Sequence, residues 1–272
     1  MGDTASHGRR LDSAVLKPAH QPRFPQELLW FLVGREIKIR YRRSFFGLTW
    51  ALFQPVPLAL VLYLVFSGTF REQVPDYAAY VLSGVIFWTF FQNGVLSSIN
   101  SLHRSAATLR QLPVQAGVFP IAAVISSGVH LSLSLIAVLG LLLATGLAPS
   151  PALLSLPVSV VIAVVFTAGV GLLLAPLALF FGDANEAIGL ILGVLVYATP
   201  VFYPVSVLPP ALQSVVVNSP LAAILACFRE PILHGALPAA GVMANALGSA
   251  AIAFTLGWTV FARYRYRIPF HV

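Results

Sequence analysis

The densest group of reactive side chains in this sequence is a run of cations near the N-terminus. Five of the ten residues in REIKIRYRRS carry a positive charge: Arg35, Lys38, Arg40, Arg42 and Arg43. Guanidinium and ammonium groups at this density bind phosphate or anionic lipid head groups. No charged residue follows from Ser44 until Arg71, which is more than the ~20 apolar residues needed to cross a bilayer. The run is therefore expected on the cytoplasmic membrane surface.

Side chains for catalysis are missing from the apolar segments of the sequence. There are no paired carboxylates, no His-Glu-x-x-His and no Gly-x-Ser-x-Gly, and neither Lys17 nor Lys38 follows a glycine as a Walker-type phosphate loop requires. His130 is the one ionisable side chain at membrane depth, and we expect a neutral group hydrogen-bonded between helices rather than a proton relay. A single cysteine, Cys227, without a Cys/His cluster predicts no disulfide and no metal site.

The composition indicates an all-α integral membrane protein. Of the 272 residues, 58% are hydrophobic and 9% are charged, whereas a soluble domain has about 25% charged residues. The net charge of +7 does not indicate nucleic acid binding, because the cations gather at one membrane face. Residues 1–26 are polar and rich in proline, so they predict a disordered cytoplasmic tail.

Residues 27–46 predict an amphipathic helix at the membrane interface. Trp30, Val33, Ile37 and Tyr41 recur at spacings of three and four and form one stripe, and most of the cations fall elsewhere on the helical wheel. The alternation of residues 37–42 would also suit a β-strand. We favour the helix, because an isolated strand at a membrane has no partner.

Six membrane spans are predicted within residues 47–262, at about 47–70, 77–101, 118–145, 152–181, 187–202 and 241–262. Pro55 and Pro57 should kink the first span. Five prolines between positions 200 and 220 predict short helices that fold back at or just inside the outer surface before the last span. This topology leaves 14 of the 16 Lys and Arg residues inside, including a basic cytoplasmic tail at 263–272, and only Arg71 and Arg229 outside.

Three stretches follow one another in a fixed order along residues 28–262. The first joins residues 35–44 to Gly47, Trp50-Ala51-Leu52 and Gln54-Pro55. The second is Tyr80-Val81-Leu82-Ser83-Gly84 with Trp88, Phe90-Phe91, Leu109-Arg110 and Phe119-Pro120. The third is Thr199-Pro200-Val201-Phe202-Tyr203-Pro204 with Leu208-Pro209, Asn218-Ser219-Pro220-Leu221-Ala222, Arg229, Leu233 and Gly235.

Together these stretches resemble the permease subunits of type-2 ABC exporters for lipid-linked polysaccharides such as O-antigen, capsule, galactan or teichoic acid. The sequence departs from that family at Gly182-Asp183, where Arg-Asp is frequent, and after Phe261, where a glutamate is usual. The resemblance implies a homodimer in the bacterial cytoplasmic (inner) membrane, with both termini cytoplasmic and two copies of a separate ABC ATPase that bind ATP and Mg. It further implies contact with membrane lipids and a glycan linked to undecaprenyl- or polyprenyl-pyrophosphate, and no cofactor in this chain.

The resemblance also implies three groups of site residues. The gate helix would use Arg35, Lys38, Arg40, Tyr41, Arg42 and Arg43. A coupling helix at Leu102–Leu112, which would otherwise read as a solvated loop, would dock on the ATPase through Leu102, His103, Arg104, Thr108, Leu109 and Arg110. The outer gate would include Pro200, Tyr203, Pro204, Asn218, Pro220 and Arg229.

Aromatic residues of the second span are candidates for the substrate path. If this span begins at Tyr77, Trp88 lies about 16 Å deep in a ~30 Å hydrocarbon core, too deep for an interfacial aromatic belt. Sugar rings have apolar faces that slide over aromatic planes. We therefore expect Phe87, Phe90, Phe91 and Trp88 to line the path with Tyr63 and Phe66, and the competing interpretation is core packing.

Two other functions compete with polysaccharide export. A type-2 ABC exporter of small hydrophobic drugs would share the architecture, and only the first stretch and the aromatic content argue against it. A membrane-embedded lipid-processing enzyme would need a cluster of carboxylates or histidines at one interface, and the sequence has only isolated ones.

Overall fold

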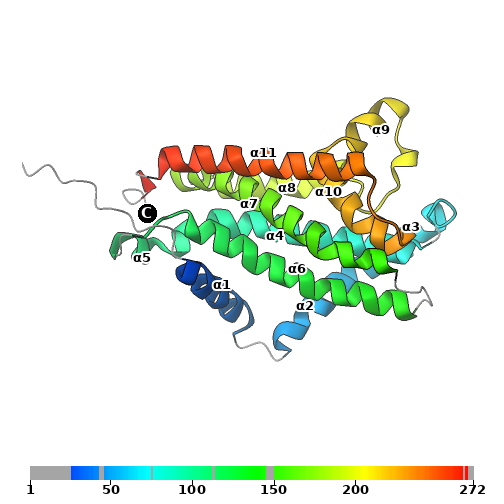
Figure 1. Cartoon of the computed structure of the whole chain (residues 1–272), viewed down its shortest axis with the longest axis horizontal. Helices are drawn as coiled ribbons and strands as arrows, with labels where there is room; N and C mark the ends of the chain where they lie inside the picture. Colours follow the sequence, from blue (N-terminus) through cyan, green and yellow to red (C-terminus); the bar gives the residue numbers. More distant parts are fainter. Residues whose placement is uncertain are drawn as a thin grey trace, which may run out of the picture.

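The computed structural model describes residues 26–42, 46–74, 76–111, 114–144, 150–265 and 267–268, and every regular element in these ranges is a helix. The predicted tail at 1–25, Arg43 of the predicted gate helix and Leu112 of the predicted coupling helix lie outside the described residues. The main helices run along one long axis of the molecule (Figure 1). The prediction of an all-α protein is confirmed.

Five helical segments of the described chain are long and apolar enough to cross a membrane. These are α2 with α3 (Trp50–Phe53 and Pro55–Phe70), α4 (Tyr77–Arg104), α6 (Val118–Ala144), η2 with α7 (Pro151–Ser155 and Leu156–Phe180) and α11 (Ala240–Tyr264). The first is preceded by a 3₁₀ turn, η1 (Gly47–Thr49), and is interrupted at Gln54 because Pro55 has no N–H to donate to the preceding turn. The chain is therefore a multi-pass membrane protein.

The fifth predicted span is shorter than expected. It forms α8 (Ala184–Ala198), which begins three residues before the predicted 187–202 and ends four residues early. Thr199 is extended, with φ −101° and ψ 137°, because the ring of Pro200 disfavours helical backbone in the residue before it. The 15 residues of α8 reach about 22 Å, so this helix alone is too short for a ~30 Å core.

The proline-rich segment after α8 forms short, sharply bent helices, as predicted. After a 3₁₀ turn, η3 (Val205–Val207), α9 (Pro210–Val217) projects from one end of the molecule (Figure 1). α10 (Pro220–Arg229) continues into the π-helix η4 (Glu230–His234), at 76° to α9. α10 packs against α4, α7 and α11, so it returns into the bundle.

α4 lies at the centre of the bundle and packs against α3, α6, α7, α8 and α10. Beside it, α7 and α11 cross with almost no space between their backbones. A Cβ atom on Gly257 would lie 2.0 Å from the carbonyl oxygen of Gly169. Membrane helices use such small residues to bring their backbones into direct contact.

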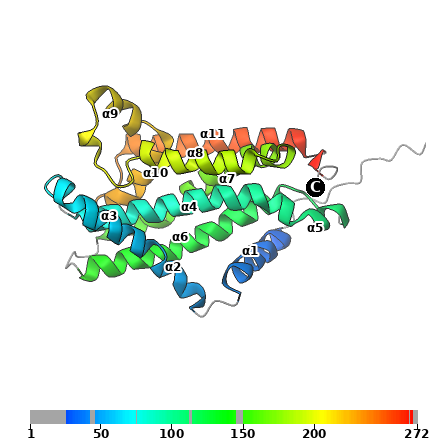
Figure 2. The same cartoon turned by 180° about the vertical axis from the view of Figure 1, so that it is seen from behind.

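The N-terminal helix α1 (Gln26–Tyr41) and the short α5 (Ala106–Gln111) lie at the same end of the bundle as the end of α11, opposite α9 (Figures 1 and 2). The helix predicted at 27–46 forms at 26–41, and Arg42 after it lies in a turn. Within the predicted stripe, Val33 is buried and Ile37 packs against the same hydrophobic cluster, whereas Trp30 is 63% exposed. Leu32, which lies outside the stripe, is buried as well. α1 buries the face that packs against α6, its main neighbour.

Candidate functional site

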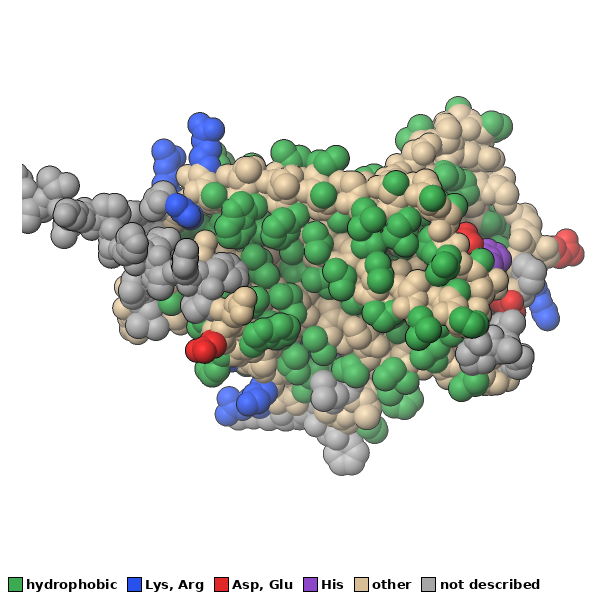
Figure 3. Space-filling model, viewed as in Figure 1, with side chains coloured by type: hydrophobic (Ala, Val, Ile, Leu, Met, Phe, Trp, Pro, Cys, Tyr) green, Lys and Arg blue, Asp and Glu red, His purple; other side chains and the backbone are tan. Residues whose placement is uncertain are grey.

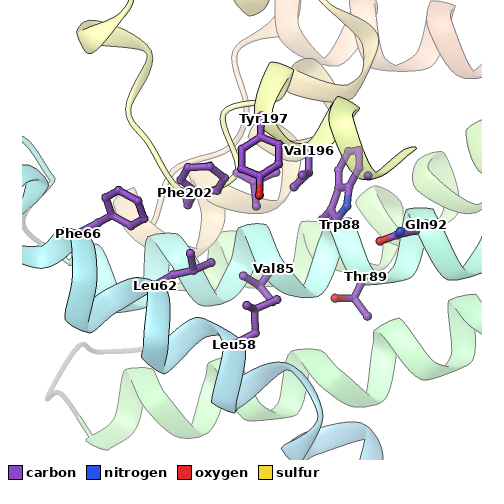
Figure 4. Close-up of a pocket in the computed structure, with 12 residues that line it drawn as sticks. Leu58, Leu62, Phe66, Val85, Trp88, Thr89, Gln92, Val196, Tyr197 and Phe202 are labelled. Atoms are coloured by element: carbon purple, nitrogen blue, oxygen red, sulfur yellow. The ribbon is translucent and has the colours of Figure 1, made fainter. Parts of the chain in front are cut away.

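A cavity of about 600 Å³ lies between α3, α4, α8 and the loop that follows α8. Figure 4 shows aromatic rings of Phe66, Phe202 and Tyr197 in a row on one side, and Trp88 rising from α4 toward α8. Thr89 and Gln92 are the polar residues that α4 contributes. The remaining lining residues are Leu58, Leu62, Val85, Gly193, Val196 and Val201. Every lining residue is uncharged, so this is an apolar, aromatic cavity with few polar groups.

The aromatic wall of the cavity comes from three separate elements. The rings of Phe66 (α3) and Phe202 (loop) stack with centroids 5.6 Å apart, and the ring of Tyr197 (α8) meets Phe202 edge-on at 5.7 Å. Tyr197 and Phe202 were absent from the predicted path. The quoted stretch Thr199–Pro204 contains Phe202, but only the turn after α8 brings it against α3.

The predicted path residues occupy two different places. Trp88 and Phe66 line the cavity. Phe87, Phe90 and Phe91 are each at most 3% exposed in the core of the chain, where Phe87 packs on Phe228. Tyr63 stacks on Tyr77 beside the cavity, with ring centroids 6.3 Å apart. The cavity face of α4 therefore follows the spacing 85, 88, 89 and 92, and the three phenylalanines lie on its other faces.

At the end of the cavity near α9, the loop after α8 is held by a cluster that we call the Arg229 clamp, formed by Tyr77, Tyr80 and Arg229. The guanidinium of Arg229 donates to the carbonyl oxygens of Pro200 (2.6 Å) and Val201 (2.5 Å). It also donates to the carbonyl oxygen of Tyr80 (3.2 Å) and lies 3.5 Å from the centroid of the Tyr80 ring.

The two tyrosines complete the clamp. Tyr77 donates to the carbonyl oxygen of Phe202 (2.7 Å), and Tyr80 donates to those of Tyr203 (2.7 Å) and Pro200 (3.3 Å). An irregular backbone within a membrane protein needs such donors, because lipid supplies none. The clamp thus satisfies carbonyl groups of the loop at residues 200–203, which have no helical partners.

The predicted outer-gate residues fall into two groups around the clamp. Pro200, Tyr203 and Arg229 come together in it, and Pro204 directly precedes η3. Asn218 and Pro220 lie at the bend between α9 and α10. There, Asn245 of α11 donates to the carbonyl oxygen of Asn218 (3.1 Å), and Pro220 begins α10.

At the opposite end of the bundle, α1 is attached to α6 and α4 by polar side chains. Tyr41 is hydrogen-bonded to Nδ1 of His130 (2.5 Å), and Arg40 donates to the hydroxyl of Ser127 (3.3 Å). Glu36 forms a salt bridge of 3.2 Å with Arg104 at the end of α4. Burial raises the pKa of the Tyr41 phenol above its ordinary value. His130 is thus the hydrogen-bonding group between helices that the sequence predicted.

Three further cations, Arg35 and Lys38 of α1 and Arg42 just after it, lie together on another surface of this helix. Arg35, Lys38 and Arg42 line a groove of about 600 Å³ together with Trp30, Phe31, Gly34 and Ile39. Trp30, Phe31 and Ile39 are each more than half exposed. The groove therefore combines a cationic edge with an apolar surface, and Arg40 does not belong to it.

The predicted coupling helix at 102–112 is wrong in its boundaries. Leu102, His103 and Arg104 form the last turn of α4, and Ser105 interrupts the helix with φ −105° and ψ 13°. α5 then contains Thr108, Leu109 and Arg110. The buried side chains of Leu102 and Leu109 share a hydrophobic cluster with Leu32 and Val33 of α1, so these segments pack together.

The described residues thus form a bundle of apolar helices, with segments long enough to cross a membrane and an apolar cavity between α3, α4 and α8. The chain belongs to the ABC-2 type transporter family, whose profile matches residues 27–233.

Named relatives of this chain are permease and transport proteins. It is 27% identical over 242 residues to the O-antigen export system permease protein RfbA of Myxococcus xanthus, covering 88% of this chain and 92% of that protein. The protein of the same name from Klebsiella pneumoniae is 26% identical over 212 residues, with 78% and 82% covered. The polysialic acid transport protein KpsM of Escherichia coli is 22% identical over 208 residues, with 74% and 79% covered.

Proposed function

We propose that this chain is the transmembrane subunit of an ATP-driven exporter that carries a lipid-linked polysaccharide across the bacterial cytoplasmic membrane. The names of its relatives support this substrate class. ATP and Mg would be bound by two copies of a separate ATPase, since this sequence lacks a phosphate loop. Both termini would be cytoplasmic, with residues 1–26 and 263–272 as tails around the gate helix and the six-span domain.

The observation that carries the proposal is the uncharged aromatic cavity between α3, α4 and α8. Aromatic planes can contact the apolar faces of sugar rings, and the lack of fixed charges avoids ion pairs that would hold a long polymer in place. The outer faces of α3 and α8 beside this cavity are apolar and exposed. A second copy of the chain packed on these faces would enclose the cavity, which supports a homodimer.

We assign the polyprenyl-pyrophosphate of the substrate to the groove on α1. Arg35, Lys38 and Arg42 supply cations for the pyrophosphate, and Trp30 and Phe31 supply an apolar surface for the lipid. Simple anchoring of α1 to anionic lipid is the alternative.

The ATPase would dock at α5. Movement of the ATPase would be transmitted from α5 to α1 by two contacts. These are the hydrophobic cluster of Leu102, Leu109, Leu32 and Val33 and the salt bridge between Glu36 and Arg104. At the opposite end, the Arg229 clamp with α9 and α10 would form the outer gate.

Paired double variants test the assignment of the cavity. Phe66→Leu with Trp88→Leu removes aromatic planes from the cavity, whereas Phe87→Leu with Phe91→Leu removes the same number of rings from the core. In liposomes that contain the complete complex with its ATPase, the cavity pair should leave ATP hydrolysis per folded complex intact but reduce glycan export. The core pair should lower stability by about 1 kcal/mol per substitution. Normal export by the cavity pair would refute the assignment.

A second comparison separates a substrate-binding α1 groove from an anchoring one. Lys38→Gln with Arg42→Gln removes two of the three cations that line the groove, and Arg40→Gln is the control because this side chain bonds Ser127 instead. Binding to substrate predicts normal membrane yield and reduced export for the groove pair only. A reduced yield of the groove pair, with normal export per complex, would instead support anchoring.

A further inference from the structure

A second exposed groove, of about 540 Å³, lies between α7 and α11 near the end of the bundle that holds α5. It is separate from the aromatic cavity and from the groove on α1. Its lining consists of Leu173, Leu174, Pro176, Leu177, Phe180, Phe181, Val260, Tyr264 and Arg267. The aromatic floor is formed by Phe180 and Tyr264, whose ring centroids are 5.8 Å apart.

The apolar part of this groove is the length of one lipid leaflet or less. Leu173, Leu177 and Phe181 follow at steps of four residues and are 39%, 45% and 62% exposed, so they form one outward-facing line. Eight residues of helix extend about 12 Å, less than half of a ~30 Å hydrocarbon core. A neighbouring transmembrane helix would need a contact face along the whole core, whereas a lipid chain needs only one leaflet.

One end of the groove is basic. Arg267 lines it, and Arg263 is exposed in the last turn of α11. No carboxylate is among the described lining residues. In Figure 3, Lys and Arg side chains gather at this end of α11 beside a hydrophobic surface. Cations at one end of a short apolar groove complement a molecule with an anionic head and hydrocarbon chains.

We propose that this groove binds an anionic phospholipid, with its head group at Arg263 and Arg267 and an acyl chain along Leu173, Leu177 and Phe181. The proposal rests on the orientation in the proposed function, which places this end of α7 and α11 at the cytoplasmic leaflet. Anionic lipids of that leaflet attract basic residues next to a membrane span. Neither the ATPase nor the glycan takes part in this binding.

The test is native mass spectrometry of the purified full chain titrated with phosphatidylglycerol and with phosphatidylcholine of the same acyl chains. We expect the wild-type chain to retain phosphatidylglycerol more tightly. Arg263→Gln with Arg267→Gln should weaken phosphatidylglycerol binding by up to about 25-fold, roughly fivefold per arginine, and leave phosphatidylcholine unchanged. Leu177→Trp, which fills the apolar part, should weaken the binding of both lipids.

Two matched variants control for charge and bulk elsewhere. Arg71→Gln removes a cation at the opposite end, and Val161→Trp adds a ring at an exposed position of α7 outside the groove. Both should bind lipid as the wild type does.

Equal binding of the two lipids by the wild type, or unchanged phosphatidylglycerol binding by the arginine pair and by Leu177→Trp, would overturn the proposal. If the wild type retains no lipid and forms dimers that are lost in the Leu177→Trp variant, a second copy of the chain covers the groove and the proposal is wrong. Because the readout is bound lipid, it is independent of glycan export.

Discussion

Replacing Arg229 with leucine tests whether the loop after α8 is held by side-chain donors from α4 and α10. The substitution removes the hydrogen bonds to the carbonyl oxygens of Pro200, Val201 and Tyr80, together with the contact on the Tyr80 ring. It keeps an apolar side chain at a position that is only 8% exposed. The loop should therefore loosen while the surrounding helices keep their packing.

The expected change in the free energy that keeps the loop closed is the difference between lost hydrogen bonds and a lost desolvation penalty. Each carbonyl oxygen that Arg229 leaves unpaired costs about 1–3 kcal/mol, and a hydrogen bond to a charged group contributes about 1.5–3 kcal/mol. Removing a buried guanidinium also removes its desolvation penalty, which is several kcal/mol per ion. We therefore expect a net loss of about 2–4 kcal/mol in the free energy that keeps the loop closed. Tyr80→Phe removes only the hydroxyl bonds to Tyr203 and Pro200 and should cost about 1 kcal/mol.

The assay is hydrogen exchange of the purified protein, read on peptides that contain residues 199–204. A loss of 2–4 kcal/mol corresponds to exchange that is about 30-fold to 900-fold faster at these amides. Tyr80→Phe should show an increase of about fivefold. Arg71→Gln, an exposed cation at the same end, should change nothing. If the loop of a folded Arg229→Leu variant exchanges at the wild-type rate, the clamp does not hold the loop.

Three further outcomes are expected. Gly257→Ala should lower the apparent Tm, because its Cβ atom would lie 2.0 Å from the α7 backbone. Gly248→Ala on the same helix should leave the Tm unchanged, because a Cβ atom there has nothing within 4 Å. Equal Tm values for the two variants would contradict the close crossing of α7 and α11. Tyr41→Phe removes the hydroxyl that bonds the buried imidazole of α6 and should destabilise α1 by about 1 kcal/mol, measured as faster exchange across α1; unchanged exchange would mean that this bond contributes nothing. A cysteine at Thr108 should react with an impermeant thiol reagent in inside-out vesicles only, and labelling of intact cells would reverse the proposed topology.

Local features of the sequence are sufficient to predict most of the helices. Uncharged runs of more than 20 residues predict the five long segments, because a bilayer excludes charge over a fixed thickness. Pro55 and Pro57 predict a kink in the first span, and the prolines that crowd after position 200 predict the bent helices there, since each removes a donor and restricts its neighbour. Thr199 shows the limit of this reasoning, because placing the fifth span by hydropathy alone extended it past the proline.

Which side chains meet could be decided only by the tertiary structure. Trp88 and Phe87 are adjacent and both aromatic, yet one lines the cavity and the other packs on Phe228, because α8 and α10 cover different faces of α4. Arg40 and Arg42 are equally charged, yet only Arg42 lines the groove on α1, because α6 takes the other face. Hydropathy and proline act within one segment of chain, and so the sequence alone determines which segments are helices and where they lie to within a few residues. The environment of a side chain depends on neighbours that are distant in sequence, and only helix packing brings those neighbours together.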